Sequence, residues 1–149
     1  MYILRWLKKY ELLCTFKENN EGCTTPDIMA DILIVDDNEV TVKSVEHLLS
    51  KEGYVVVSAT NGREARRLLN DFNFDLVVTD LMMPFVSGTD LVKYIKNDLN
   101  KQDLPIIMVS SIKDEKSKME CYNLGVDIYL TKPIMPTELY VMIKKLLRH

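Results

Sequence analysis

The sequence predicts an α/β fold in which a parallel sheet is covered by helices on both faces. Five short apolar runs alternate along the chain with segments whose apolar residues recur at helical spacing. Strands with little polar alternation, separated by helices, are typical of a buried parallel sheet. The predicted strands are residues 31–36, 54–58, 75–79, 105–109 and 127–131.

Five helices are predicted to follow these strands. The residues that mark their ends are Gly53 after the first, Asn61-Gly62 before the second, Gly88 before the third, Gly125 after the fourth (near 114–124) and Pro136 at the start of the fifth. The side chains expected to pack inward are Val42, Val45, Leu48 and Leu49, then Ala65, Leu68, Leu69 and Phe72, then Leu91 and Ile95, then Met119 and Tyr122, and finally Leu139, Met142, Ile143 and Leu146.

Length and composition indicate one ordinary domain with a hydrophobic core. The chain has 149 residues, is 47% hydrophobic and carries a formal charge of −3, which gives no long-range attraction to nucleic acid. No apolar run approaches the roughly 20 residues that span a bilayer. The three cysteines lack metal-site spacing, and no signal-peptide pattern is present, so we expect a cytoplasmic protein.

Residues 1–29 stand outside the strand–helix alternation. Ile3, Leu4 and Leu7 are spaced for a short amphipathic helix, and the segment that follows is polar and rich in turn-forming residues. We expect an N-terminal extension over 1–29, helical or disordered and dispensable for the chemistry, and a domain over 30–149. A helix that binds a partner through Trp6 and Tyr10 is the alternative.

Polar side chains stand where the predicted strands end. Asp36 and Asp37 close the first strand, Asp80 the third, Ser110 the fourth and Lys132 the fifth. In a parallel sheet, ligands bind outside the carboxyl ends of the strands. Carboxylates about 5 Å apart repel each other by roughly 3 kcal/mol at an effective dielectric near 20. A divalent cation, and Mg²⁺ in particular because it prefers hard oxygen ligands, would offset this repulsion beside a phosphoryl group.

The stretch from Asp80 to Gly88 contains an acid, then Met-Pro, then a glycine that opens a helix. Together with Asp36-Asp37, Ser110 and Lys132-Pro133 in register over residues 31–148, it resembles the receiver domain of two-component response regulators. The resemblance implies a flavodoxin-like, doubly wound sheet of order 2-1-3-4-5. It also implies a signalling domain rather than an enzyme, phosphorylated on Asp80 by a sensor histidine kinase or a histidine phosphotransfer protein.

The resemblance further assigns roles to individual residues. Magnesium is expected on Asp36, Asp37, Asp80 and the backbone carbonyl of Met82, and Lys132, aimed by a cis bond to Pro133, is expected to neutralise a phosphoryl oxygen. Asp36 could instead cap the first helix, although Asn38 could take that place.

Ser110 and Tyr129 look like a switch pair. Ser110 would turn toward the phosphoryl group, and Tyr129 would enter the vacated space and change the surface formed by the fourth helix, fifth strand and fifth helix. That surface is expected to bind a protein effector. The sequence leaves open whether the domain also forms a phosphorylation-dependent homodimer. The alternatives without a switching role are that Ser110 is a capping serine and that Tyr129 is an ordinary tyrosine of an amphipathic strand.

Three positions that follow the acceptor aspartate or the switch serine are expected to set the rates of phosphorylation and of phosphoaspartate hydrolysis. Ser111 is small and leaves a path for the donor, whereas Met82 and Ile112 offer no group to orient a hydrolytic water, which predicts a long-lived phosphoaspartate.

Other classes fit less well. A haloacid-dehalogenase-like, Mg-dependent phosphatase needs a second aspartate two residues after its nucleophile, where this chain has Met82. A flavodoxin-like nucleotide binder needs a glycine-rich loop after the first strand, which is absent. The sequence leaves open a stand-alone receiver or a receiver fragment of a longer response regulator or hybrid kinase.

Overall fold

The computed structural model describes residues 30–147, in which a five-stranded parallel sheet is flanked by five helices. The elements in chain order are β1 (Asp31–Val35), α2 (Glu39–Lys51), β2 (Val55–Ala59), α3 (Gly62–Asp71), β3 (Leu76–Asp80), α4 (Gly88–Asn97), β4 (Ile106–Ser110), α5 (Glu115–Leu124), β5 (Ile128–Thr131) and α6 (Pro136–Leu146). The strand order is β2-β1-β3-β4-β5, and every neighbouring pair is parallel. The fold and strand order predicted from the sequence are confirmed.

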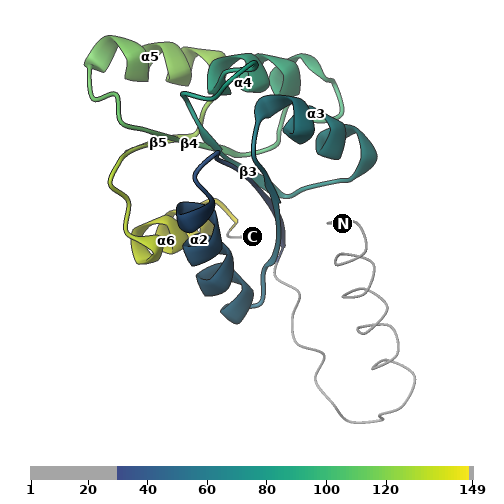
Figure 1. The fold of residues 1–149 in the computed structure, drawn as a ribbon. Helices are drawn as coiled ribbons and strands as arrows, with labels where there is room; N and C mark the ends of the chain where they lie inside the picture. The colour runs from purple at the N-terminus through teal and green to yellow at the C-terminus, as the bar shows by residue number, and fades with distance from the viewer. Residues whose placement is uncertain (1–29, 148–149) are drawn as a thin grey trace.

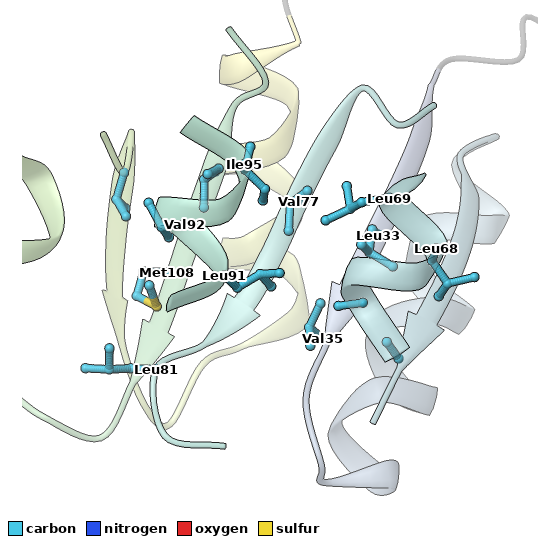
Figure 2. Packing of buried hydrophobic residues seen from close by; sticks show 14 of the residues in the cluster. Leu33, Val35, Leu68, Leu69, Val77, Leu81, Leu91, Val92, Ile95 and Met108 are labelled. Atoms are coloured by element: carbon cyan, nitrogen blue, oxygen red, sulfur yellow. The ribbon is translucent and has the colours of Figure 1, made fainter. Parts of the chain in front are cut away.

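Helices cover both faces of the sheet. The pair α2 and α6 lies on one face, and α3, α4 and α5 lie on the other (Figure 1). Each face has its own hydrophobic cluster. On the second face, Leu69 of α3 and Leu91 and Ile95 of α4 belong to the same cluster as Leu33 and Val77 of the central strands (Figure 2). This burial on both faces explains why the strand sequences show so little alternation.

The helices begin and end through local hydrogen bonds. Asn38 caps α2, since its side-chain oxygen accepts from the backbone N–H groups of Val40 and Thr41. Asn61 caps α3 in the same way, and Gly125 ends α5 in the left-handed conformation, with φ of +108°. Since Asn38 caps α2, the carboxylate of Asp36 is available for other contacts.

The inward face of α5 differs from the prediction. Met119 and Tyr122, expected to pack against the sheet, are exposed, and the residue of α5 that is buried is Cys121. The prediction was wrong because this helix has few apolar residues, so a small thiol fills the contact with the core. The hydroxyl of Tyr122 instead accepts a hydrogen bond from the backbone N–H of Tyr129. Four other side chains expected inside are only half-buried: Leu48, Phe72, Met142 and Leu146.

Four strands begin one residue later than predicted, and the first ends at Val35. The shift places Asp80 and Ser110 inside β3 and β4 as their last residues. Two of the residues just before the strands differ from ladder residues. A carboxylate oxygen of Asp75 accepts a hydrogen bond from the backbone N–H of Asp31, and Pro105 has no N–H to donate to a neighbouring strand. The prediction for the 1–29 extension lies outside the described residues. Within 30–147, no helix combines the length and apolarity that crossing a membrane requires.

Candidate functional site

Three carboxylates meet at the carboxyl edge of the sheet. Asp36 follows β1 directly, Asp37 comes next, and Asp80 ends β3. One oxygen from each lies within 4.8 Å of the others. Asp36 and Asp80 are buried, being 6% and 7% exposed, whereas Asp37 faces solvent. The sequence prediction that these acids converge is confirmed by this geometry.

Lys132 joins the cluster from the end of β5, a strand at the edge of the sheet. Its ammonium nitrogen lies 2.8 Å from Oδ2 of Asp80 and 3.3 Å from Oδ2 of Asp36. The residue follows β5 directly, its backbone N–H donates to the carbonyl of Ser110, and its bond to Pro133 is cis. One cation is therefore shared by the two buried carboxylates.

Each buried carboxylate is also held by the backbone. Oδ1 of Asp36 accepts from the N–H of Asn38 at 2.9 Å, and Oδ1 of Asp80 accepts from the N–H of Met82 at 3.1 Å. The other oxygen of each group bonds Lys132. Both side chains are thus fixed in orientation, with their remaining lone pairs free for a ligand.

The electrostatics reflect this partial burial. Burial raises the pKa of Asp36 above its ordinary value, and the backbone hydrogen bond from Asn38 and the charge of Lys132 oppose the rise. Burial would lower the pKa of Lys132, but its hydrogen bond to Asp80 and the charges of Asp36 and Asp80 together raise it. Lys132 therefore stays an ammonium group, while burial makes the charged form of Asp36 less favourable than that of an ordinary aspartate.

The loop after Asp80 leaves the site and returns to it. The N–H of Gly88, at the start of α4, donates to the carbonyl of Leu81 at 2.9 Å. A Cβ placed on Gly88 would lie 2.3 Å from the carbonyl oxygen of Asp80. Only glycine permits this approach, so Gly88 fixes the backbone of Asp80. The sequence marked Gly88 only as a helix start, and this contact was missed because nothing in a one-dimensional pattern reports it.

Ser110 and Tyr129 both bond the backbone of Ile112. The Ile112 N–H donates to Oγ of Ser110 at 3.0 Å, and the Tyr129 hydroxyl donates to the Ile112 carbonyl at 2.7 Å. Ser110 is fully buried, and Tyr129 is 8% exposed. The sequence interpretation had Tyr129 entering after Ser110 moves. In this structure Tyr129 is already inside while Ser110 still holds the loop.

A family model described as the response regulator receiver domain matches residues 32–144. That range includes all of the five strands except Asp31, the first residue of β1, and it includes every carboxylate of the site. The chain belongs to the response regulator receiver family.

Relatives of known name support the assignment. The response regulator SaeR of Staphylococcus aureus (strain USA300) is 39% identical over 119 residues, which cover 80% of this chain and 51% of SaeR. The probable transcriptional regulator ycf29 of Pyropia yezoensis is 33% identical over 116 residues, covering 78% of this chain and 52% of the relative. This receiver thus spans about half the length of the curated relatives it matches.

A solved structure agrees in fold. The chemotaxis response regulator CheY4 of Vibrio cholerae superimposes with a TM-score of 0.75 at 30% identity, covering 79% of this chain and 98% of CheY4. The receiver family is a signalling family of two-component systems rather than a class of conventional enzymes, and its members interact with histidine kinases and effector domains.

The acid cluster of this receiver fits a hard divalent cation. Three carboxylates within 4.8 Å provide oxygen donors of the kind that Mg²⁺ prefers. The backbone N–H of Met82 donates to Oδ1 of Asp80 at 3.1 Å, so the chain next to the phosphoacceptor candidate is held against its carboxylate. The donor set therefore matches the metal that receiver domains generally bind at this acidic pocket.

The three positions expected to tune rates are placed differently from one another. Met82 is 66% exposed, and Ser111 is also exposed. Ile112 is half-buried and packs against the hydrophobic cluster under α3, α4 and α5. The side chain of Ile112 is therefore engaged with the core of this receiver.

Proposed function

We propose that this receiver accepts a phosphoryl group on Asp80 from the phosphohistidine of a sensor histidine kinase or a histidine phosphotransfer protein. The observation that supports this most directly is the contact of Asp80 with Lys132, 2.8 Å apart, beside two further carboxylates. The change of state is then passed to a protein partner. These exchanges are expected to take place in the cytoplasm.

The transfer step needs little covalent chemistry from the protein. A carboxylate oxygen of Asp80 forms a bond to phosphorus while the phosphorus–nitrogen bond of the phosphohistidine breaks, and the imidazole leaves with the electron pair and takes a proton. Positioning and charge neutralisation dominate a loose transition state of this kind. Asp80 is positioned by the N–H of Met82 and by Gly88.

Charge neutralisation is assigned to Lys132 and to a metal. Mg²⁺ held by Asp36, Asp37, Asp80 and the carbonyl of Met82 would supply positive charge to the phosphoryl oxygens. Lys132 is close enough to move from the carboxylate of Asp80 to one of those oxygens as a charge-assisted donor. This is self-catalysed phosphotransfer, and slow loss of the group to water would follow as autodephosphorylation.

The switch is proposed to act through Ile112. A phosphoryl group adds about −1.5 to −2 charge and three acceptor oxygens. Ser110 would turn its hydroxyl toward one of these and release the N–H of Ile112, while Tyr129 keeps the carbonyl of the same residue. The loop between β4 and α5 would then move relative to β4 while it stays bonded to Tyr129 of β5, and the two conformers would differ in partner affinity.

The readout surface is proposed to be the face of α5, β5 and α6. Its helices carry exposed apolar side chains: Met119 (55% exposed) and Tyr122 on α5, and Val141 (58% exposed) on α6. The occupant is a protein effector, and a phosphorylation-dependent homodimer is the alternative. No direct contact with nucleic acid or membrane is proposed for this domain.

The domain itself is proposed to span residues 30–149, with 1–29 as an extension dispensable for phosphorylation. Deleting 1–28 should leave phosphorylation intact, and a dead product would refute that division. The full protein is proposed to be either a stand-alone receiver, a longer response regulator or a hybrid kinase.

Incubation with acetyl phosphate and Mg²⁺ tests the proposal. Wild type should gain one acid-stable, base-labile phosphoryl group, and Asp80→Asn should gain none. Peptide mapping should place the group on residue 80. Wild type that gains no mass, or gains it elsewhere, would refute the proposal. Steady hydrolysis of many phosphate monoesters would instead favour a Mg-dependent aspartate-nucleophile phosphatase, which Met82 argues against.

A further inference from the structure

We propose that Phe85 and Arg63 form a docking ledge for the protein that donates the phosphoryl group, and that this ledge helps to select the donor. The proposal rests on the phosphoacceptor role of Asp80 proposed above. It adds a partner-contacting pair that takes no part in the chemistry itself.

Phe85 combines backbone strain with exposure. Its φ is +69°, and it is the one non-glycine residue with positive φ in the described part of the chain. The left-handed conformation is unfavourable for a bulky side chain, whereas asparagine and glycine tolerate it. The ring is 87% exposed, so burial in the fold does not offset the strain.

The ring of Phe85 contacts a cation from another element. The guanidinium carbon of Arg63, in the first turn of α3, lies 5.7 Å from the ring centroid. The two segments also pack closely, because a Cβ on Gly62 would lie 2.6 Å from Cβ of Val86 and 2.8 Å from its carbonyl oxygen. The ledge is therefore a fixed apolar and cationic surface shared by the start of α3 and the loop that precedes α4.

This ledge is carried in part by the loop that leaves the phosphoacceptor. The loop that carries Phe85 starts at Asp80 and returns to it, since Gly88 packs on the Asp80 carbonyl. Asp80 is only 7% exposed. A phosphohistidine must bring its phosphorus within bond-forming distance of that carboxylate, about 3–3.5 Å, so the donor protein has to press on the residues around the opening.

Apolar side chains gather at this edge of the sheet. Of the eight most exposed large hydrophobic residues in the described chain, four follow the carboxyl ends of β1, β3 and β5: Val40, Met82, Phe85 and Met135. Exposed apolar groups close together mark contact surfaces. The fitting partner presents, next to its phosphohistidine, an apolar side chain for Phe85 and a carboxylate for Arg63.

The test compares a small donor with protein donors on the full chain. Phe85→Asn removes the ring and relieves the left-handed backbone, and Arg63→Glu reverses the charge at a helix N-terminus, where an acid is favourable. Leu99→Asn is the matched control, because Leu99 is 82% exposed at the far end of α4. Each variant is labelled with acetyl phosphate, and then by the ATP-phosphorylated histidine kinases and phosphotransfer proteins of the source organism.

The expected result is a separation of the two donors. Acetyl phosphate should label all variants at the wild-type rate, and Tm should not fall in Phe85→Asn. Transfer from the fastest protein donor should drop at least about tenfold in Phe85→Asn and in Arg63→Glu, as for a contact at the centre of an interface, and stay unchanged in Leu99→Asn. Wild-type transfer rates in both variants, or a loss of Tm in Phe85→Asn, would overturn the docking ledge. Failure of wild type to take phosphate from acetyl phosphate would instead refute the proposed function.

Discussion

The ammonium nitrogen of Lys132 lies 2.8 Å from a carboxylate oxygen of Asp80, the residue that ends the central strand β3. The same nitrogen reaches Asp36 at 3.3 Å. Without this cation, two buried carboxylates would face each other with no direct neutralising partner among the described residues. Lys132 is therefore expected to stabilise the fold before any phosphoryl group arrives, in addition to the chemical role proposed for it above.

Replacing Lys132 with alanine should affect stability and chemistry differently. In metal-free buffer the free energy of unfolding should fall by about 1–3 kcal/mol, because two partly buried acceptors lose a charged donor. Phosphorylation by acetyl phosphate should slow roughly a hundredfold, because one preorganised charge at the transition state is lost. Urea unfolding and initial labelling rates measure the two effects.

Lys118→Ala is a matched control for that experiment. Lys118 pairs with the exposed Glu115 one turn earlier on α5 at 3.4 Å, and such pairs contribute less than about 1 kcal/mol. Added Mg²⁺ should restore most of the stability of Lys132→Ala but not its labelling rate. Equal recovery of both would mean that the lysine acts only as a counter-ion.

Magnesium should stabilise the folded receiver through the three carboxylates. At a concentration of 100 Kd, binding to the native state alone adds about 2.7 kcal/mol to the free energy of unfolding. Thermal melts with increasing Mg²⁺ should show a rising Tm for wild type and little change for Asp37→Asn. An equal rise in both would place the ion elsewhere.

The pH dependence of stability should carry the signature of Asp36. Since its pKa is raised in the folded protein above the ordinary value of 3.8, the native state binds this proton more tightly than the unfolded chain does. The stability that this group contributes is therefore fully present below about pH 3.8 and is lost as pH rises from there through the raised pKa of the folded protein. Asp36→Asn should exceed wild type in stability at pH 7 without metal, and the difference should shrink toward pH 4.

Comparing the two proteins at each pH removes the other acids from the result. Asp98 and Asp114 have lowered pKa values, through hydrogen bonds from Lys101 and from Ser117 respectively, and so act in the opposite direction in both proteins. Urea midpoints in the presence of a chelator give the difference. A gap that grows on acidification would contradict the assigned burial effect.

Gly88→Ala should damage the site, whereas Gly125→Ala should damage only stability. The added Cβ at Gly88 would meet the Asp80 carbonyl at 2.3 Å, and such overpacking costs about 1–3 kcal/mol. At Gly125 the cost, about 1–2 kcal/mol, comes from the left-handed backbone far from the acids. At a temperature where both are folded, acetyl phosphate labelling should be slow in the first variant and normal in the second.

Substitution of Met82 should change the lifetime of the phosphoaspartate without changing stability, whereas substitution of Ile112 should change both. Met82→Asn places a polar group on a 66% exposed side chain, so hydrolysis should speed up without loss of stability. Ile112→Glu should also speed it, but with a lower Tm, because Ile112 packs against the hydrophobic cluster. Decay of the labelled protein after removal of the donor measures both. An unchanged lifetime in both variants would remove these positions from the rate argument.

Much of the fold was predictable because it depends on local patterns. Glycine and asparagine signals placed the ends of α2, α3 and α5, and apolar runs placed five strands to within one residue. The carboxylates were predictable for a topological reason: in a parallel sheet, the ends of central strands share one edge. Asp36 and Asp80 therefore had to be neighbours once the strands were correct.

The parts that were missed depend on three-dimensional packing. Cys121 fills the contact under α5 because the helix is rotated away from Met119, which a sparse apolar pattern could not reveal. The approach of Gly88 to Asp80 and the inward position of Tyr129 depend on distances between separate elements. Positive φ at Phe85 was equally hidden, since a phenylalanine gives no turn signal.

The bond between Lys132 and Asp36 joins residues 96 positions apart. A chain that has formed β1 and β3 but not yet added β5 has its acids in place and lacks the cation that makes them usable. If Asp80 accepts phosphate as proposed, full chemical competence requires the last strand to dock. Acetyl phosphate should then label quickly only those molecules in which β5 has joined the sheet.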